Sequence, residues 1–194
     1  MPKDTKHTLR REAVRLFAER GYSAVSMREL AEAVGMRQGG IYNHFPSKQA
    51  LLADLMATHM ETLLATLEDA LSMAQTPENR LAAFVRNHMA FHLDHPDDVF
   101  LAYMEIRSLE PENRAAIVEL RNTYEKCLRD ILKDGVTAGV FQLADVDIHT
   151  RMLLAMLTGA TTWYREGGRL KRHEVAMCYL QGAMQSVGAG MERA

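Results

Sequence analysis

The chain contains 194 residues, of which 47% are hydrophobic and 25% charged, a composition typical of a globular protein with a packed core. Its N-terminus is polar and basic, and no segment approaches the roughly 20 apolar residues of a membrane span, so we expect a cytoplasmic protein without a signal peptide or membrane partner. The net charge of −2 is uneven: residues 1–48 hold nine Lys and Arg against five Asp and Glu, a net of +4, and the remainder carries −6.

The first helix is predicted from Leu9. Apolar residues at Leu9, Ala13, Leu16 and Phe17 follow the i, i+4, i+7, i+8 spacing of an amphipathic helix. Residues 1–8 are polar, and we expect them to be frayed. The apolar stripe should pack beneath the helices that come next.

A second helix is predicted from Ser26 to Val34. Glu29 follows Ser26 by three residues, the capping-box spacing in which each side chain satisfies the other residue's free backbone amide. From Met27 onward, apolar residues recur at i, i+3, i+4 and i+7, so one face must be buried. Gly35 should end the helix, because a residue that leaves a helix in the left-handed conformation is least strained without a Cβ.

A third, shorter helix is predicted over residues 38–45, where only Ile41 and Phe45 require burial. Two short helices joined by a glycine-containing turn form a helix-turn-helix, whose second helix enters the DNA major groove. Arginine reads guanine, and glutamine and asparagine read adenine, whereas Tyr, His and Lys side chains can hold phosphates. The glycines lack side-chain bulk and suit close approach of the backbone. The residues predicted to contact DNA are Ser26, Met27, Arg28, Arg37, Gln38, Gly39, Gly40, Tyr42, Asn43, His44 and Lys48.

An ordered set of residues within 9–55 carries a resemblance to a known family: Phe17, Gly21, Tyr22, Ser26, Met27, Arg28, Leu30, Ala31, Gly35, Gly39, Ile41, Tyr42, His44, Phe45, Ser47, Lys48, Leu51 and Leu52. In these residues the segment resembles the DNA-binding domain of TetR-family regulators. Arg37 stands where the family usually has a small polar residue and Gln38 where lysine is common, which leaves the operator sequence open. The resemblance implies a homodimer with an all-helical C-terminal ligand domain, usually a repressor released from double-stranded operator DNA by a small molecule.

The rest of the chain also reads as helical. A long helix begins at Lys48, capped by Ser47, and its apolar stripe continues to Leu71. We expect this helix to link the N-terminal DNA-binding part to the rest of the chain. Further helices are predicted over residues 77–95, 97–109, 111–138, 147–165 and 172–187. We therefore predict an all-α fold of about nine helices, with a three-helix DNA-binding domain (residues 1–50) and a helical ligand-binding and dimerisation domain (residues 51–194).

The last two helices are the candidates for dimerisation. Their small residues, which let helices approach closely, are Thr158, Gly159, Ala160, Thr161, Thr162, Gly182, Ala183 and Ser186. In the family these two helices pair with their copies as a four-helix bundle. A two-fold dimer would also place two reading helices about 34–36 Å apart, the spacing of successive major grooves. The alternative is that the small residues pack within one chain.

Histidines on the helix over residues 77–95 suggest a second kind of site. His88, His92 and His95 recur at i, i+4 and i+7, a spacing that can bind a transition metal, and Asp94, Asp97 or Asp98 could add an oxygen ligand. No HExxH-type base accompanies them, so we favour neutral histidines bonded to backbone, with no metal or other cofactor. The sequence also lacks nucleophile motifs, phosphate-binding glycine loops and paired carboxylates, which argues against an enzyme. The cysteines, Cys127 and Cys178, are expected to be reduced, buried thiols.

Residues 163–172, WYREGGRLKR, place four cations and one anion around two aromatic side chains at a helix end. The segment is either a capped helix terminus or the mouth of a site for an acidic ligand, where arginine binds phosphate and an aromatic face stacks on a ring. The pattern is similar to one in TetR-type regulators of fatty-acid and steroid catabolism that respond to acyl-CoA thioesters. The predicted effector-binding residues are His88, His92, Met104, Tyr124, Met156, Trp163, Arg165 and Arg169.

These features predict a ligand-responsive, homodimeric, DNA-binding repressor. Its effector would be a small hydrophobic or acidic molecule such as an acyl-CoA thioester, with methionines as adaptable pocket walls. The alternatives are a DNA-binding architectural protein without an effector and a metal-dependent hydrolase. The operator, the regulated genes and the identity of the effector are not determined by the sequence.

Overall fold

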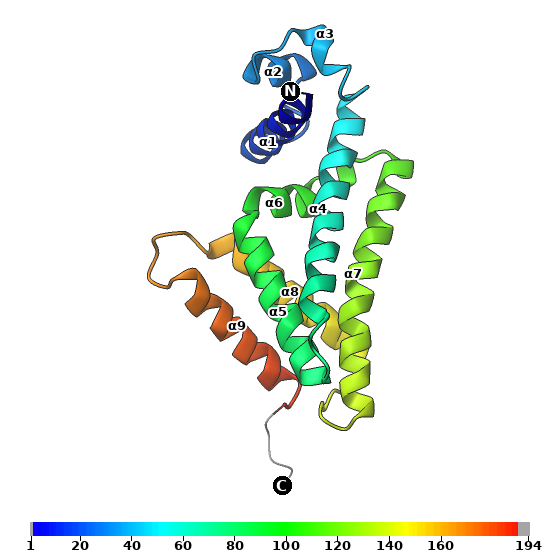
Figure 1. Ribbon diagram of the computed structural model, residues 1–194, viewed down its shortest axis with the longest axis vertical. Helices are drawn as coiled ribbons and strands as arrows, with labels where there is room; N and C mark the ends of the chain where they lie inside the picture. Colours follow the sequence, from blue (N-terminus) through cyan, green and yellow to red (C-terminus); the bar gives the residue numbers. More distant parts are fainter. Residues whose placement is uncertain (1, 190–194) are drawn as a thin grey trace. The chain divides into compact units, whose positions relative to one another are not determined.

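The computed structural model describes residues 2–189, apart from the side chains of residues 2–4 and of Gln38. Within this range the chain forms nine α-helices, one 3-10 helix and no strand, which confirms the all-α prediction (Figure 1). The helices are α1 (Pro2–Arg20), α2 (Met27–Ala33), α3 (Gln38–Ile41), α4 (Lys48–Leu71), α5 (Pro77–Asp94), α6 (Pro96–Met104), η1 (Ile106–Ser108), α7 (Pro111–Thr137), α8 (Val146–Trp163) and α9 (Arg172–Ser186). None of these helices is long and apolar enough to cross a bilayer.

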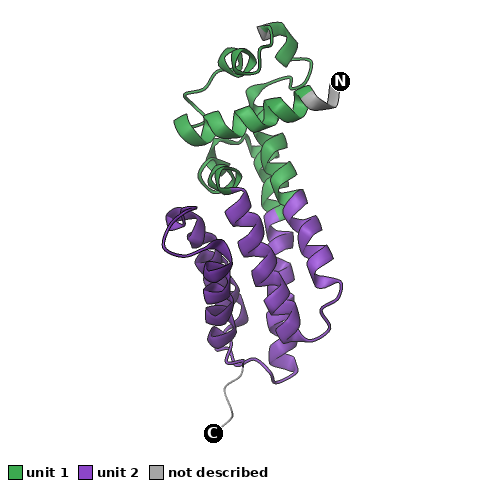
Figure 2. Ribbon diagram, turned by 60° about the vertical axis from the view of Figure 1, so that its left-hand side comes forward, with its two compact units in different colours: residues 1–61, 96–120 green, residues 62–95, 121–194 purple. Residues whose placement is uncertain are grey.

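The chain divides into two compact units (Figure 2). The first unit contains residues 1–61 and 96–120, and the second contains residues 62–95 and 121–194. Helices α4 and α7 contribute to both units, because two of the boundaries fall inside them. The sequence did not indicate that α6, η1 and the first turns of α7 fold together with the N-terminal helices. A functional boundary at residue 50 stays a prediction.

The first unit has one hydrophobic core, built from the apolar stripes that the sequence predicts. In α1, Leu9 and Phe17 are fully buried, and the Phe17 ring meets the Tyr22 ring edge to face at 5.2 Å. Helices α6 and α7 add Leu101 and Ile117 to the same core. Since burying a side chain of this size contributes about 1.5–3 kcal/mol, α6 and α7 are a substantial part of what stabilises the N-terminal helices.

Two helix boundaries near the N-terminus differ from the prediction. Helix α1 begins at Pro2, a residue suited to the first helical position, so residues 2–8, which were expected to be frayed, are helical. Its Lys6 lies 3.6 Å from the Asp54 carboxylate and 5.1 Å from the centre of the Phe45 ring. Helix α3 ends at Ile41, and turns continue to Phe45, whose amide donates to the Ile41 carbonyl at 3.0 Å. Two glycines among its four residues, both weak helix formers, explain why α3 is short.

In the second unit, α5 packs against both α8 and α9. Phe84 and Met89 of α5 are fully buried, as are Leu128 of α7 and Leu157 of α8. At Gly135 of α7, the Phe141 ring occupies the space that a Cβ would need. The loop after α7 therefore folds back onto the helix that precedes it.

The two candidate dimerisation helices carry apolar residues on both sides. Ala160 and Ala183 are buried within the unit, as the single-chain alternative predicts. The residues on the opposite, outward face of α8 are Ile148, Met152, Ala155, Gly159 and Thr162, spaced alternately by four and three. A helix that is apolar on both its inward and its outward face can pack against a second partner through the outward face.

Both cysteines are free thiols, but only one of them is shielded. Cys127 is half-buried in α7, and its burial raises the pKa of the thiol. Cys178 is exposed on α9, on the same side as the exposed Gln181, so the expectation that it is buried is wrong. The inward face of α9 is formed by Val175, Leu180 and Ala183, and Cys178 lies outside it next to Met177, which is also exposed.

Candidate functional site

The start of α2 has the capping box that the sequence predicts. The Ser26 hydroxyl accepts a hydrogen bond from the Glu29 amide at 3.2 Å, and the Glu29 carboxylate accepts one from the Ser26 amide at 2.8 Å. Arg20 donates to the same carboxylate at 2.8 Å. The Ser26 hydroxyl, then the Ser26 amide, then Arg20 lower the pKa of Glu29 to about 2. The bonds that cap α2 are therefore stronger when the Glu29 carboxylate is ionised.

Replacing Glu29 with Gln is expected to reduce stability at pH 7 but not at pH 2. The folded-state pKa lies below the ordinary 4.5, so the carboxylate's contribution to the free energy of unfolding is complete above pH 4.5 and is lost as the pH falls toward 2. Urea unfolding of wild type and Glu29→Gln between pH 7 and pH 2 measures this difference. The control is Glu32→Gln, which changes an exposed carboxylate of the same helix. If Glu29→Gln lowered the free energy of unfolding equally at every pH, the low pKa assigned to Glu29 would be contradicted.

The outward face of α3 and its following turn is accessible, as a reading surface requires. Tyr42 is 46% exposed, and Arg37 and Asn43 are also exposed, while Ile41 and Phe45 are buried in the core. The guanidinium of Arg37 makes no hydrogen bond or ion pair with a described residue, and it does not cap the helix that it precedes. The predicted contact through the side chain of Gln38 lies outside the described residues.

The fold itself does not require glycine at the two positions inside α3. A Cβ at Gly39 would meet nothing within 4 Å, and one at Gly40 would meet only the flexible end of Met36 at 3.2 Å. Neither glycine has a positive φ, in contrast to Gly35, whose φ of 69° ends α2 as predicted. The close approach of DNA to these two glycines therefore stays a prediction.

Three of the predicted DNA contacts already have partners in the free chain. The side chain of Met27 is buried in the core of the first unit. The Lys48 ammonium lies 4.1 Å from the centre of the Tyr22 ring, and burial there lowers the pKa of the lysine. Arg28 is exposed and 3.6 Å from the Glu32 carboxylate. A phosphate contact by Lys48 would therefore compete with the Tyr22 ring.

The buried histidines of α5 form a hydrogen-bonded cluster with α7 and α8. The two ring nitrogens of His88 lie 3.1 Å from the Tyr124 hydroxyl and 3.3 Å from the Thr158 hydroxyl. The His92 ring stacks on the His88 ring at 3.7 Å and bonds to the His88 carbonyl at 3.0 Å. His95 is exposed and bonds to the backbone of Phe91. Across residues 2–189 no three His, Cys, Asp or Glu side chains are grouped to hold a metal.

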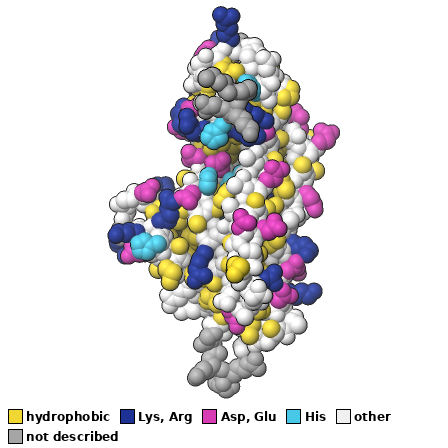
Figure 3. Space-filling view, viewed as in Figure 1, with side chains coloured by type: hydrophobic (Ala, Val, Ile, Leu, Met, Phe, Trp, Pro, Cys, Tyr) yellow, Lys and Arg dark blue, Asp and Glu magenta, His cyan; other side chains and the backbone are white. Residues whose placement is uncertain are grey.

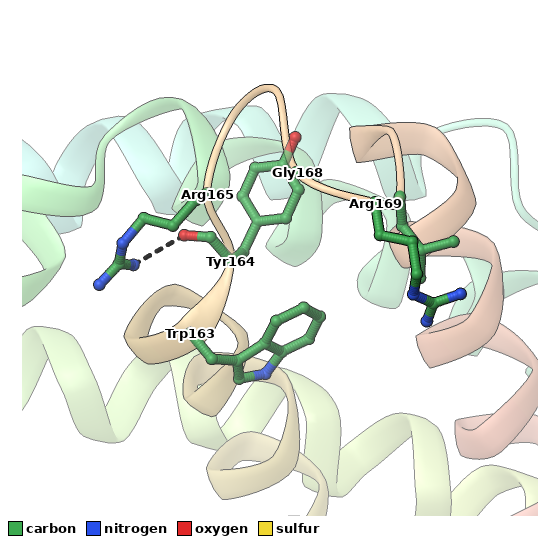
Figure 4. Close-up of a pocket in the computed structure, with 6 residues that line it drawn as sticks. Trp163, Tyr164, Arg165, Gly168 and Arg169 are labelled. Carbon is green, nitrogen blue, oxygen red and sulfur yellow. Dashed lines mark hydrogen bonds between the residues drawn. The ribbon is translucent and has the colours of Figure 1, made fainter.

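A pocket of about 230 Å³ lies at the end of α8, at the segment the sequence marked as basic and aromatic. Its lining residues are Trp163, Tyr164, Arg165, Gly168, Arg169 and Leu170. Figure 4 shows Arg165 turned away from the Trp163 ring, toward the Tyr164 carbonyl to which it donates at 2.8 Å. Arg169, on the other side of the pocket, makes no hydrogen bond or ion pair with any described residue and is available to an anion.

Charge and aromatic packing define the surroundings of this pocket. Lys, Arg and His side chains gather over the α8–α9 loop (Figure 3), where the sequence has Arg165, Arg169, Lys171, Arg172 and His173. The Trp163 indole donates to the Tyr179 hydroxyl at 3.2 Å. Arg172 pairs with Asp94 at the end of α5, which ties the loop to the body of the unit.

The predicted effector-binding residues do not all lie together. His88, His92 and Tyr124 belong to the buried cluster, and Trp163, Arg165 and Arg169 line the pocket. Met156 is half-buried on α8. Met104, 51% exposed on α6, belongs to the other compact unit. The sequence missed Thr158 as a partner of His88, because a hydrogen bond between helices 70 residues apart leaves no local signal.

Known proteins share this arrangement of helices and this sequence pattern. Residues 9–55 match the family described as bacterial regulatory proteins of the tetR family, and residues 74–187 match the tetracyclin repressor-like C-terminal domain. The HTH-type transcriptional repressor KstR2 of Mycobacterium tuberculosis is 29% identical over 170 residues, covering 87% of this chain and 85% of KstR2.

Solved structures agree with these matches. The TetR-family regulator PfmR from Thermus thermophilus is 34% identical with a TM-score of 0.83, covering 95% of this chain and 99% of PfmR. AibR, crystallised with isovaleryl coenzyme A and operator DNA, shares the fold, with 24% identity, a TM-score of 0.85 and coverage of 92% and 97%. This chain therefore belongs to the TetR family and is a DNA-binding transcriptional regulator rather than an enzyme.

Proposed function

We propose that this protein is a homodimeric cytoplasmic repressor that binds a two-fold symmetric operator through two copies of α3 and leaves it when a small acidic effector binds. Two outward surfaces carry the proposal. The exposed Arg37 and Asn43 match the donor and acceptor pattern of base edges in the major groove. The outward apolar face of α8, with Ile148 and Met152, offers a second copy a surface on which to pack.

The effector is proposed to be an acyl-CoA thioester or a related anion. Support comes from the unpaired Arg169 beside the Trp163 ring, since a guanidinium binds phosphate and an indole stacks on a base. AibR, which shares the fold, binds isovaleryl coenzyme A. A pocket of about 230 Å³ is below the usual size of a whole-ligand site, so it would hold one end of such a molecule. His88, His92, Tyr124 and Met156 stay the proposed contacts for the rest.

Release would follow from a coupling between effector and operator binding. Such coupling typically amounts to about 1–3 kcal/mol, which changes operator affinity roughly 5- to 150-fold. The effector must bind more tightly to the arrangement of the dimer that does not fit the operator, because equal affinity for both arrangements changes nothing.

Arg169→Ala is expected to weaken the response to an acyl-CoA without changing operator affinity in its absence. Loss of one exposed cation should raise the isovaleryl-CoA concentration needed for half-maximal operator release by about fivefold. Thermal shift and fluorescence anisotropy on a selected operator measure the two quantities. The control is Arg86→Ala, an exposed arginine of α5 away from the pocket, which should behave as wild type.

The outcome of this experiment also separates the alternatives. If Arg169→Ala responds as wild type does, the basic loop is a structural helix terminus. If a panel of acyl-CoAs, free acids and planar drugs neither stabilises the wild-type protein nor weakens operator binding, an architectural DNA-binding role without an effector is favoured.

A further inference from the structure

Polar side chains join three separate segments of the first unit at one point. The Gln49 amide nitrogen, at the start of α4, donates to the Ser108 carbonyl of η1 at 2.6 Å and to the Tyr22 hydroxyl at 3.1 Å. The Gln49 side-chain oxygen accepts from the Glu110 amide at 3.0 Å. One side chain thus binds the α1–α2 loop and both sides of the η1–α7 turn. We name Tyr22, Gln49, Glu105, Ser108 and Glu110 the clasp.

Glu105 closes the clasp from the opposite side. Its carboxylate accepts from the Tyr22 amide at 3.0 Å and from the Ser108 hydroxyl at 2.6 Å. Tyr22 is therefore bound at both ends, by its backbone amide and by its hydroxyl, while Lys48 covers the face of its ring at 4.1 Å. These contacts are partly buried, so water competes less for them than at an exposed surface.

The clasp lies next to the start of α2, the helix on which α3 packs. Tyr22 lies in the short loop that leads from α1 to the Ser26 cap of α2, so fixing Tyr22 fixes where α2 begins. Helices α2 and α3 pack on each other, and the direction of α3 follows from that of α2. The same corner is held on its apolar side by Leu101 and Leu109, which are buried in the core of the unit.

The chain enters and leaves the first unit at three points, within α4, before Pro96 and after Leu120. Two of these three points bound the segment, residues 96–120, that supplies Glu105, Ser108 and Glu110 to the clasp. A displacement of that segment would be passed to the reading helices through Gln49 and Glu105.

We infer that Gln49 and Glu105 are positioning residues that fix the direction in which α3 is presented and thereby set the half-site spacing that an operator must have. The inference rests on the proposed dimer, because the spacing between half-sites affects binding only when two copies of α3 are linked in one assembly. One inserted base pair moves a half-site by about 3.4 Å and turns it by roughly 35°. If α3 is held rigidly, the dimer should lose affinity for an operator with the changed spacing. If α3 can change direction, it should bind both operators with similar affinity.

The experiment compares operators that differ only in spacing. An operator is selected from random duplexes with the wild-type protein, and derivatives are made with one base pair inserted or deleted between the half-sites. Wild type is expected to prefer the selected spacing by about tenfold or more. Gln49→Met keeps the length of the side chain but loses its three hydrogen bonds, and should reduce this preference to about threefold or less.

A second pair of variants guards against a failure of Gln49→Met to fold. Glu105→Ala should lose the spacing preference, whereas Glu105→Gln, which can still accept from Tyr22 and bond to Ser108, should keep it. Unchanged spacing preference in folded Gln49→Met or Glu105→Ala, with only a lower melting temperature, would make the clasp purely structural and overturn the inference. A wild-type protein that shows no spacing preference and binds as a monomer would instead overturn the proposed dimer and this inference with it.

Discussion

Met152→Glu is expected to convert the protein to monomers and to lower operator affinity by at least about 100-fold. Met152 is 59% exposed at the middle of the outward face of α8. In a two-fold dimer packed on this face, the substitution would bury two like charges. One uncompensated buried charge costs roughly 3–5 kcal/mol, and about 1.4 kcal/mol is a tenfold change in affinity.

Sedimentation velocity and a salt titration of operator binding measure these effects together. The monomer should lose about half of its phosphate contacts, so the slope of log affinity against log salt should fall by about half. Met73→Glu is the matched control, because Met73 is 87% exposed just after α4 and away from this face. A dimeric Met152→Glu protein with wild-type affinity would exclude this face of α8 from the dimer.

Arg37→Ala and Asn43→Ala are each expected to weaken binding to the preferred operator by about 1–3 kcal/mol, or roughly 5- to 150-fold. Both side chains are exposed, and both lie close in sequence to Gly39 and Gly40 of α3. If they touch base edges, the loss should be confined to the base pairs that they read, and other sequences should bind with nearly unchanged affinity.

Binding of each variant to a library of operator point mutants measures both affinity and preference. Arg114→Ala, an exposed arginine of α7 in the same compact unit, is the control for loss of one positive charge. If Arg37→Ala lowered the affinity for all sequences equally and reduced the slope of log affinity against log salt by about one, Arg37 would contact a phosphate instead of a base.

The N-terminal helices could be predicted from sequence because their signals are local. Ser26 and Glu29 are three residues apart and form the capping box that their spacing predicts. Gly35 has the positive φ that ends α2, and Ser47 caps α4 through the Ala50 amide at 3.0 Å. In each case the residues that decide the conformation are neighbours in the chain, so the physical cause is visible without the fold.

The remaining features depend on partners far along the chain. Gln49 meets Ser108 across 59 residues and Glu105 meets Tyr22 across 83, and no periodicity in either segment signals these bonds. For the same reason, the sequence did not indicate that residues 96–120 form one compact unit with the N-terminal helices. Met27 was predicted both for the buried face of α2 and for DNA contact, and the structure places its side chain in the core.

The pocket proposed to bind the effector was the least predictable part. The aromatic and basic composition of residues 163–172 located the pocket, but it did not distinguish the roles of its two arginines. Arg165 is bonded to the backbone of Tyr164, whereas Arg169 is available to a ligand. That difference follows from how the loop turns after α8, which depends on Gly167 at a φ of 78° and on the Arg172 pair with Asp94.

Footprinting of the protein on an operator selected from random DNA, with hydroxyl radicals for the sugars and dimethyl sulfate for guanine N7 in the major groove, tests the central claim most directly. Sedimentation gives the stoichiometry of the same complex. We expect two chains on an inverted repeat, with protected half-sites one helical turn, about 34–36 Å, apart and the major groove of each shielded. Removal of the Arg37 and Asn43 side chains should uncover those groove positions. A single protected site occupied by one chain, or protection that persists in those variants, would contradict the account.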